Sequence, residues 1–250
     1  MMTVTLFAVL IASCAGTSDD DVPLIFAAAS LSDVLTKSAQ IYERDTGKRV
    51  DFSFGGSIAL ANQVAKLGAP ADGVFFVGER PYEVMRNAGL ISGNATGRWF
   101  TNSLVVVGAG DATRLESLDE LAASEDSVAM GDPTLAPAGV YAVEALTAAG
   151  VWDKISKSAI YALDVRAAMT AVESGNAQFG IIYKTDAISS NSLSIVYEID
   201  GGHRKIEYLP IALSGAANHS TAAAFLDFIT LNPESRSLFE SAGFKLVESG

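Results

Sequence analysis

Short apolar runs alternate with segments of helical periodicity along most of the chain, and this alternation constrains the fold more than any other feature. Residues 24–28 and 74–77 are apolar runs of strand length, and residues 50–54 are also expected to form a strand. The segments between them repeat apolar residues at three- and four-residue steps, as amphipathic helices do. This order is typical of parallel strands joined by crossover helices, so it predicts an α/β protein.

The same pattern continues to the C-terminus and predicts a second sheet. Further strands are expected at 104–107, 127–130, 180–183, 195–199 and 205–209, and further helices at 115–122, 139–149, 166–174, 222–230 and 234–242. Gly201 and Gly202 lie between the last two strands and indicate a turn that joins them as a hairpin. A chain of 250 residues is long enough for two small lobes.

We therefore predict two lobes, each a mixed sheet flanked by helices, joined by two hinge strands. The first lobe is expected to contain residues 22–103 plus 212–250, and the second residues 104–211. The hinge strands are expected near 104–107 and 208–213.

The N-terminal residues are typical of an export signal. The apolar run at 5–12 is far shorter than the roughly 20 residues that span a membrane. It ends in Ile11-Ala12-Ser13-Cys14, which resembles the lipobox of bacterial lipoproteins, in which the cysteine receives lipid. We predict that residues 1–21 are a signal and tether, that Cys14 is lipidated, and that the protein works in the periplasm or on the outer side of the membrane. A plain secretory signal with an incidental cysteine is the alternative.

Charge and residue counts exclude several classes of function. Asp and Glu outnumber Lys and Arg by 29 to 17, which gives a net charge of −12, and the basic residues form no cluster. Nucleic-acid binding is therefore not expected, and contact with a membrane is expected only through a lipid anchor. One cysteine excludes a disulfide framework, and two histidines, His203 and His219, leave little material for a metal site. Neither a cofactor nor a direct metal ligand is expected.

Four junctions between a loop and a helix contain the residues that could bind a ligand. They contain Ser30, Ser57 after Gly55-Gly56, Pro137-Ala138-Gly139, and Asp164-Val165-Arg166. Backbone N–H groups at a helix start lack intrahelical partners and can bind a small anion without a cationic side chain. Ser30 and Asp33 also fit a capping box, so both serines are alternatively ordinary helix caps.

The order of the motifs resembles the periplasmic molybdate-binding proteins of ABC-type importers. The matching segments are Phe26-Ala27-Ala28-Ala29-Ser30-Leu31, Ser53-Phe54-Gly55-Gly56-Ser57, Gly68-Ala69-Pro70-Ala71-Asp72, Asn102-Ser103-Leu104-Val105-Val106-Val107, Gly131-Asp132-Pro133, Pro137-Ala138-Gly139-Val140-Tyr141-Ala142, Asp164-Val165-Arg166, Gly180-Ile181-Ile182-Tyr183 and Ala242-Gly243-Phe244. The resemblance covers nearly all of the chain from Leu24 to Phe244.

This resemblance implies a periplasmic binding protein type II fold that closes on a tetrahedral oxyanion. In that family two serines, two backbone amides and a tyrosine hydroxyl hold the oxygens. By motif these groups fall on Ser30, Ser57, Ala138, Val165 and Tyr183. It also implies a monomer that carries molybdate, and tungstate as well, to a permease and its ATPase, and it implies no enzymatic activity.

All five groups can donate a hydrogen bond, and this favours an anion that carries no proton. Monohydrogen phosphate needs an acceptor for its P–OH group, whereas molybdate, tungstate and sulfate do not. The preference holds only if Asp132 and Asp164 do not offer an acceptor to the anion. Alternatives are a binding protein for another oxyanion, such as sulfate or phosphate, and a Ser-His hydrolase, because Gly55-Gly56-Ser57-Ile58-Ala59 approximates a nucleophile elbow.

Overall fold

The first three predicted strands are neighbours in one sheet and run parallel. In the computed structural model, which describes residues 22–91 and 99–247, β1 pairs in parallel with both β2 and β3. Each of these strands is followed by a helix, as the alternating pattern predicts. The predicted signal and Cys14 lie outside the described residues.

The first lobe is built on a sheet with the strand order β11-β4-β10-β3-β1-β2. Its elements are β1 (Leu24–Ala28), η2 (Ala29–Leu31), α1 (Ser32–Thr46), β2 (Asp51–Gly55), α2 (Ser57–Leu67), β3 (Gly73–Val77), α3 (Glu79–Asn87), β4 (Phe100–Asn102), β10 (Ile206–Ala212), α9 (His219–Leu231), α10 (Pro233–Ser241) and β11 (Lys245–Leu246). Strand β10 runs antiparallel to β3 and β4, so the sheet is mixed. Stacked Phe100 and Phe239, with ring centroids 4.2 Å apart, tie α10 to this sheet.

The second lobe is built on a sheet with the strand order β7-β6-β8-β5-β9. Its elements are β5 (Leu104–Ala109), α4 (Leu118–Ser124), β6 (Val128–Gly131), α5 (Pro137–Ala148), α6 (Trp152–Ile155), β7 (Ala159–Ala162), α7 (Val165–Glu173), β8 (Phe179–Tyr183), α8 (Lys184–Ser189) and β9 (Leu193–Ile199). Strand β6 is parallel to β7 and β8, whereas β5 is antiparallel to β8 and β9. The predicted mixed sheets are therefore present in both lobes.

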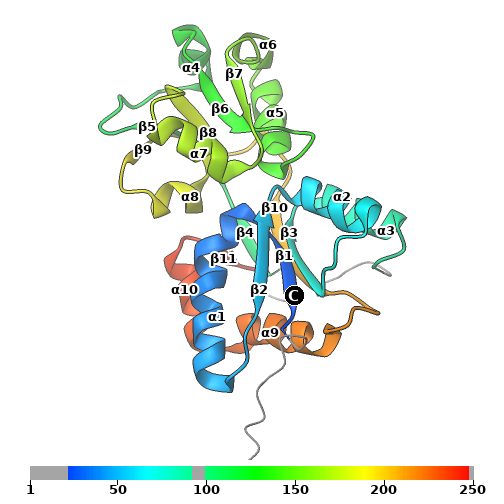
Figure 1. The fold of residues 1–250 in the computed structure, drawn as a ribbon. Helices are drawn as coiled ribbons and strands as arrows, with labels where there is room; N and C mark the ends of the chain where they lie inside the picture. The colour runs from blue at the N-terminus through cyan, green and yellow to red at the C-terminus, as the bar shows by residue number, and fades with distance from the viewer. Residues whose placement is uncertain (1–21, 92–98, 248–250) are drawn as a thin grey trace, which may run out of the picture.

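Figure 1 shows the two lobes one above the other, with the green and yellow second lobe above the blue, cyan and red first lobe. The chain crosses between them at Ser103, between β4 and β5, and again between β9 and β10. No helix of residues 22–91 and 99–247 is long and apolar enough to cross a membrane. The helix starts that carry the predicted site face one another where the lobes meet (Figure 1).

The second crossing differs from the prediction. Residues 206–211 were expected in the second lobe, but β10 belongs to the sheet of the first lobe. The expected hairpin at Gly201 and Gly202 is wrong for the same reason, because β9 and β10 lie in different sheets. Strand β10 is held by β3 and β4, which are distant in sequence, and Ile206 and Tyr208 are buried there. The crossings therefore lie at Ser103 and within residues 200–205, next to the predicted hinge strands and not inside them.

Candidate functional site

A small cavity lies between the two lobes and brings together all the predicted site residues. It is lined by Ala28, Ala29, Ser30, Gly55, Gly56, Ser57, Val77, Ala136, Pro137, Ala138, Asp164, Val165 and Tyr183. The first seven belong to the first lobe and the others to the second. Its volume of about 10 Å³ is close to the roughly 10–15 Å³ that one buried water needs, and far below the roughly 300–1,000 Å³ of pockets for drug-sized ligands.

Ser30 enters this cavity from a short 3-10 turn. It is the middle residue of η2, which continues from β1 into α1, and it is 3% exposed. The predicted capping box is wrong, because α1 begins at Ser32 and has no side-chain cap. The Ser30 hydroxyl instead lies 3.0 Å from the hydroxyl of Tyr208.

Ser57 is the first residue of α2 and is likewise not a helix cap. The capping position is Gly56, and no side chain caps this helix. The backbone N–H of Val77 donates to Ser57 Oγ at 3.3 Å. Because this amide can only donate, the Ser57 oxygen acts as acceptor there and its own proton stays available for another partner.

Ala138 and Val165 lie in the first turns of two helices of the second lobe. Ala138 is the second residue of α5 and Val165 the first residue of α7, so neither N–H has an intrahelical partner. Asp164 caps α7 by accepting from the N–H groups of Arg166 and Ala167 at 2.9 and 3.0 Å. This cap uses Asp164 Oδ1 and does not involve the N–H of Val165.

Asp132 is the other acidic residue on which the preference for an anion without a proton depends. Its carboxylate also bonds to a neighbouring residue. Its Oδ1 accepts from both the N–H and the hydroxyl of Thr134 at 2.7 Å. Asp132 is not among the residues that line the cavity. The acceptor that would favour monohydrogen phosphate is therefore not supplied by Asp132, and Asp164 Oδ1 is occupied by its helix cap.

Tyr183 supplies a hydroxyl with no other use in the described part of the chain. It ends β8, is 1% exposed, and its oxygen has no hydrogen-bond partner among the described residues. Burial raises the pKa of Tyr183 well above its ordinary value, so the hydroxyl keeps its proton at neutral pH. A buried donor without a partner is destabilising, which points to a ligand oxygen as its acceptor.

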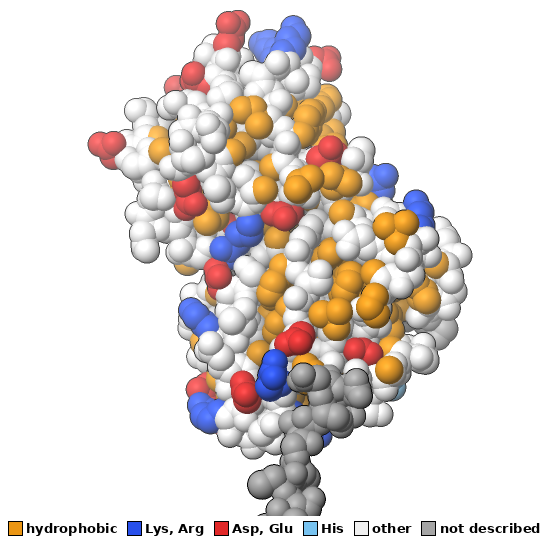
Figure 2. All heavy atoms as spheres, viewed as in Figure 1, with side chains coloured by type: hydrophobic (Ala, Val, Ile, Leu, Met, Phe, Trp, Pro, Cys, Tyr) orange, Lys and Arg blue, Asp and Glu red, His pale blue; other side chains and the backbone are white. Residues whose placement is uncertain are grey.

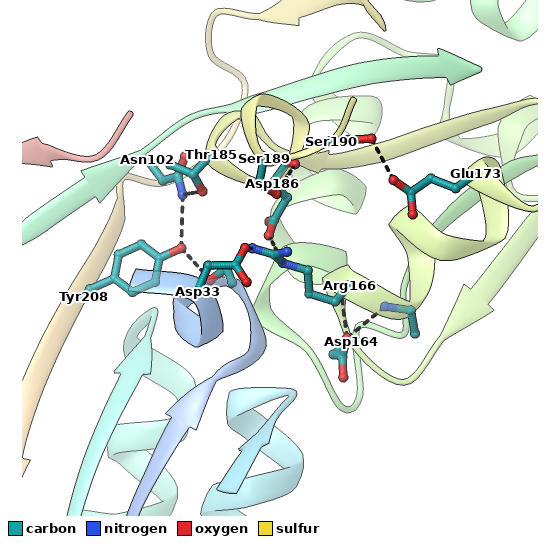
Figure 3. Close-up of polar contacts among 12 residues, drawn as sticks. Asp33, Asn102, Asp164, Arg166, Glu173, Thr185, Asp186, Ser189, Ser190 and Tyr208 are labelled. Carbon is teal, nitrogen blue, oxygen red and sulfur yellow. Dashed lines mark hydrogen bonds and ion pairs between the residues drawn. The ribbon is translucent and has the colours of Figure 1, made fainter. Parts of the chain in front are cut away.

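The lining residues include no Lys, Arg or His. The nearest cation in sequence, Arg166, is turned toward two carboxylates (Figure 3). Its Nε lies 2.6 Å from Asp186, which is fully buried, and one terminal nitrogen lies 2.8 Å from Asp33. The described cavity thus offers hydroxyl and amide protons and no cationic side chain.

The lobes are in contact around this cavity. The N–H of Ala59 in α2 donates to the carbonyl of Leu135 in the second lobe at 3.0 Å. Arg80 donates to the carbonyl of Pro133 at 3.2 Å, and the Asp33–Arg166 pair also joins the lobes. The structure therefore represents a closed arrangement of the two lobes.

Two residues beside the site were missed by the sequence analysis. Tyr208 on β10 bonds to Ser30, and Asn102 at the end of β4 bonds to Tyr208. No local motif marks Tyr208, since it meets Ser30 across 178 positions of sequence. Asn102 lies inside a matched segment, but the segment does not reveal its partner.

On the face shown in Figure 2, basic side chains are dispersed among acidic ones and form no continuous basic surface. Within the described part of the chain, no three His, Cys, Asp or Glu side chains are grouped as they would be around a metal ion. His203 Nδ1 lies 2.7 Å from the carbonyl of Arg204, and His219 Nδ1 lies 3.0 Å from the carbonyl of Leu213.

Comparisons with known proteins agree with this architecture. The model of the family described as bacterial extracellular solute-binding protein matches residues 23–245. The molybdate-binding protein ModA of Escherichia coli is 32% identical over 236 residues, which cover 92% of this chain and 91% of that protein. A putative ABC transporter substrate-binding lipoprotein of Bacillus subtilis, YvgL, is 34% identical over 224 residues, covering 88% of this chain and 85% of that protein.

A solved structure shows that the fold is shared. The periplasmic molybdate-binding protein of Azotobacter vinelandii matches with a TM-score of 0.79 and 20% sequence identity, covering 90% of this chain and 100% of that one. The expected periplasmic binding protein type II fold is therefore confirmed.

Proposed function

The chain belongs to the family of bacterial extracellular solute-binding proteins, and on that premise we propose that it captures molybdate outside the cytoplasm and delivers it to an ABC importer. Support comes from the Escherichia coli relative, which is named a molybdate-binding protein, and from the Bacillus subtilis relative, which is named an ABC transporter substrate-binding lipoprotein. The partners are then a permease and its ATPase.

The observation that carries the proposal is the set of donors around the cavity. Ser30, Ser57 and Tyr183 are buried hydroxyls, and Ala138 and Val165 offer backbone N–H groups at helix starts. We assign all five to the oxygens of the anion. Helix N-termini favour negative charge, and hydrogen bonds to an ionised acceptor contribute about 1.5–3 kcal/mol each. Such a ring can hold a dianion without a cation.

The same donors favour an anion without a proton. Each of the five groups gives a proton, Asp132 does not line the cavity, and Asp164 Oδ1 accepts from the start of α7. While all five groups donate to the anion, a P–OH group has no acceptor among them, at a cost of about 1–3 kcal/mol, or one to two decades of affinity. Molybdate, tungstate and sulfate are not penalised in this way. The choice of molybdate over sulfate rests on the named relatives.

A thermal-shift panel of molybdate, tungstate, sulfate, phosphate and chromate tests this function. Ligand that binds only the folded protein stabilises it by RT ln(1 + [L]/Kd), about 2.7 kcal/mol at a hundredfold excess over Kd. We expect molybdate and tungstate to give the largest shifts. If phosphate raised the melting temperature most, the donor-only assignment would be wrong, and if no oxyanion did, the transport function would be wrong.

The contacts between the lobes support a closing mechanism. With two serines in one lobe and the amides and Tyr183 in the other, an anion engages all five groups only when the lobes are together. Ligand therefore shifts an equilibrium between open and closed forms. We infer that a monomer in the closed form presents both lobes to the permease.

We also propose that the protein is exported and anchored through lipidated Cys14, which fits the lipoprotein name of the Bacillus subtilis relative. Fractionation tests the anchor, because the Cys14→Ser chain should leave the membrane fraction. A plain secretory signal would leave both chains in the soluble fraction.

A hydrolytic activity is not part of the proposal. The Ser57 oxygen accepts from the N–H of Val77, while the Nδ1 atoms of His203 and His219 lie beside backbone carbonyls. A Ser-His hydrolase requires a histidine bonded to the serine, and the described residues offer none to Ser57.

A further inference from the structure

A chain of hydrogen bonds outside the cavity ends at the hydroxyl of Ser30. Its members are Asn102 at the end of β4, Tyr208 on β10 and Thr185 in α8 (Figure 3). None of the three is among the residues that line the cavity. Tyr208 is fully buried and Thr185 is 3% exposed. Asn102 directly precedes Ser103, at which the chain crosses between the lobes.

The direction of the first bonds is fixed by chemistry. The backbone N–H of Ser103 donates to Asn102 Oδ1 at 2.9 Å, and a backbone N–H can only donate. This bond assigns the oxygen and nitrogen of the Asn102 amide. The nitrogen therefore donates one proton to Thr185 Oγ1 at 2.8 Å and the other to the Tyr208 hydroxyl at 3.1 Å.

The donor in the bond between Tyr208 and Ser30 follows from these assignments. The Tyr208 oxygen accepts from Asn102, and its only other hydrogen-bond partner among the described residues is Ser30 Oγ at 3.0 Å. If Ser30 donated to Tyr208, the Tyr208 proton would be buried without an acceptor, which is unfavourable. Burial also raises the pKa of Tyr208 above its ordinary value, so the proton is retained at neutral pH. Tyr208 thus donates to Ser30, whose own proton is left for the cavity.

We propose that Asn102 and Tyr208 are positioning residues that make Ser30 an obligatory donor, so that the site discriminates against oxyanions that carry a proton. The inference rests on the proposed function and extends it from the cavity wall to residues behind it. If Tyr208 instead accepted from Ser30, the Ser30 oxygen would turn only lone pairs toward the cavity and could accept a proton from monohydrogen phosphate.

Sulfate and phosphate provide the matched pair for the test, since both are tetrahedral dianions at mildly alkaline pH and only phosphate keeps a proton. Both are titrated by calorimetry in competition with molybdate, against wild type and Asn102→Asp. In the variant a carboxylate oxygen accepts from Tyr208, so Ser30 can donate to Tyr208 and turn its lone pairs toward the cavity. We expect the ratio of the phosphate Kd to the sulfate Kd to fall about tenfold in the variant, the size of one unpaired buried group. A purely structural role for Asn102 would weaken both anions alike and leave this ratio unchanged.

Tyr82→Phe is the matched control. The Tyr82 hydroxyl is also buried in the first lobe, but among the described residues it bonds only to backbone groups of Phe76 and Leu209. Its removal should leave the phosphate-to-sulfate ratio at the wild-type value. An equal fall in both variants would mean that any change to a buried polar group of this lobe loosens the site, and the proposal would be wrong.

A neutron structure of the wild-type molybdate complex gives a second route to the same answer, including the case in which Asn102→Asp does not fold. We expect the Tyr208 proton to point at Ser30 Oγ and the Ser30 proton to point at the anion. A Ser30 proton directed at Tyr208, or an unchanged ratio in the folded Asn102→Asp variant, contradicts the proposal. Failure of wild type to bind molybdate or tungstate would reject the transport function itself, whereas tight binding with an unchanged ratio rejects only the role of Asn102 and Tyr208.

Discussion

At the scale of single residues, the charge of Arg166 beside the cavity is matched by two acidic residues. Arg166 lies between Asp186 in its own lobe and Asp33 in the other, at 2.6 and 2.8 Å (Figure 3). Asp186 is fully buried, and this burial raises its pKa from 3.8 to about 7, an effect that Arg166 opposes. The ion pair of Arg166 and Asp186 therefore lies beside the cavity, and neither residue lines it.

The raised pKa of Asp186 predicts a dependence of stability on pH. Between pH 3.8 and about 7 the native state holds a proton that the unfolded chain has lost. The free energy of unfolding that Asp186 contributes therefore falls as pH rises through this window. Asp186→Asn removes the titration, so the stability of wild type minus that of the variant should fall over this range and then level off. Denaturant unfolding at a series of pH values measures this difference in stability. A difference that stays constant or rises with pH would show that the pKa of Asp186 is not raised in the native state.

Single residues also show what the sequence could predict about the site. Ser30, Ser57, Ala138, Val165 and Tyr183 all line one cavity, because the motifs that carry them are local junctions between strand and helix. The direction of the hydroxyls could not be predicted. It depends on Val77 and Tyr208, which reach the serines through sheet pairing across long stretches of sequence.

At the scale of elements, the junction between β2 and α2 determines how closely the lobes approach. A Cβ atom on Gly56 would lie 2.6 Å from the carbonyl oxygen of Leu135 and 2.8 Å from that of Leu163, both in the second lobe. Backbone atoms of another lobe can move away only if the cleft opens. Glycine is therefore needed here for close approach of two backbones, not for an unusual backbone angle.

Gly56→Ala should hold the lobes apart while leaving each lobe folded. An opening penalty of about 1.4 kcal/mol lowers affinity tenfold, and we expect at least that loss for molybdate. Small-angle scattering should show little compaction when molybdate is added to the variant, in contrast to wild type. Gly55→Ala is the control, because its Cβ would meet only the Leu60 side chain at 3.4 Å. Wild-type affinity in Gly56→Ala would show that close approach is not required.

The elements that the sequence predicts well are those with strong apolar patterns. Strand β1 has the predicted bounds. Strand β5, in which Leu104–Val107 are fully buried, is two residues longer than expected. Strand β7 was missed because it is a sheet edge on which Ile160 and Tyr161 are exposed, so it shows no burial pattern. Strands β4 and β11 are too short to carry a period.

At the scale of the whole molecule, the cavity is a property of two lobes and belongs to neither. The first lobe brings two serines and the second brings Tyr183 and two helix starts, while the chain crosses between lobes at Ser103 and within residues 200–205. The two-lobed order is predictable from alternating patterns. The second crossing is not predictable in this way. The sequence pattern of β9 and β10 predicts a hairpin, whereas long-range strand pairing places the two strands in different sheets.

A crystal structure of the molybdate complex, with the metal located by anomalous scattering, shows which groups of the protein hold the anion. We expect one molybdenum peak between the lobes, with the molybdate oxygens bonded to Ser30, Ser57, Tyr183 and the amides of Ala138 and Val165. A molybdate held by a lysine or arginine side chain, or bound away from this cavity, would contradict the proposed site.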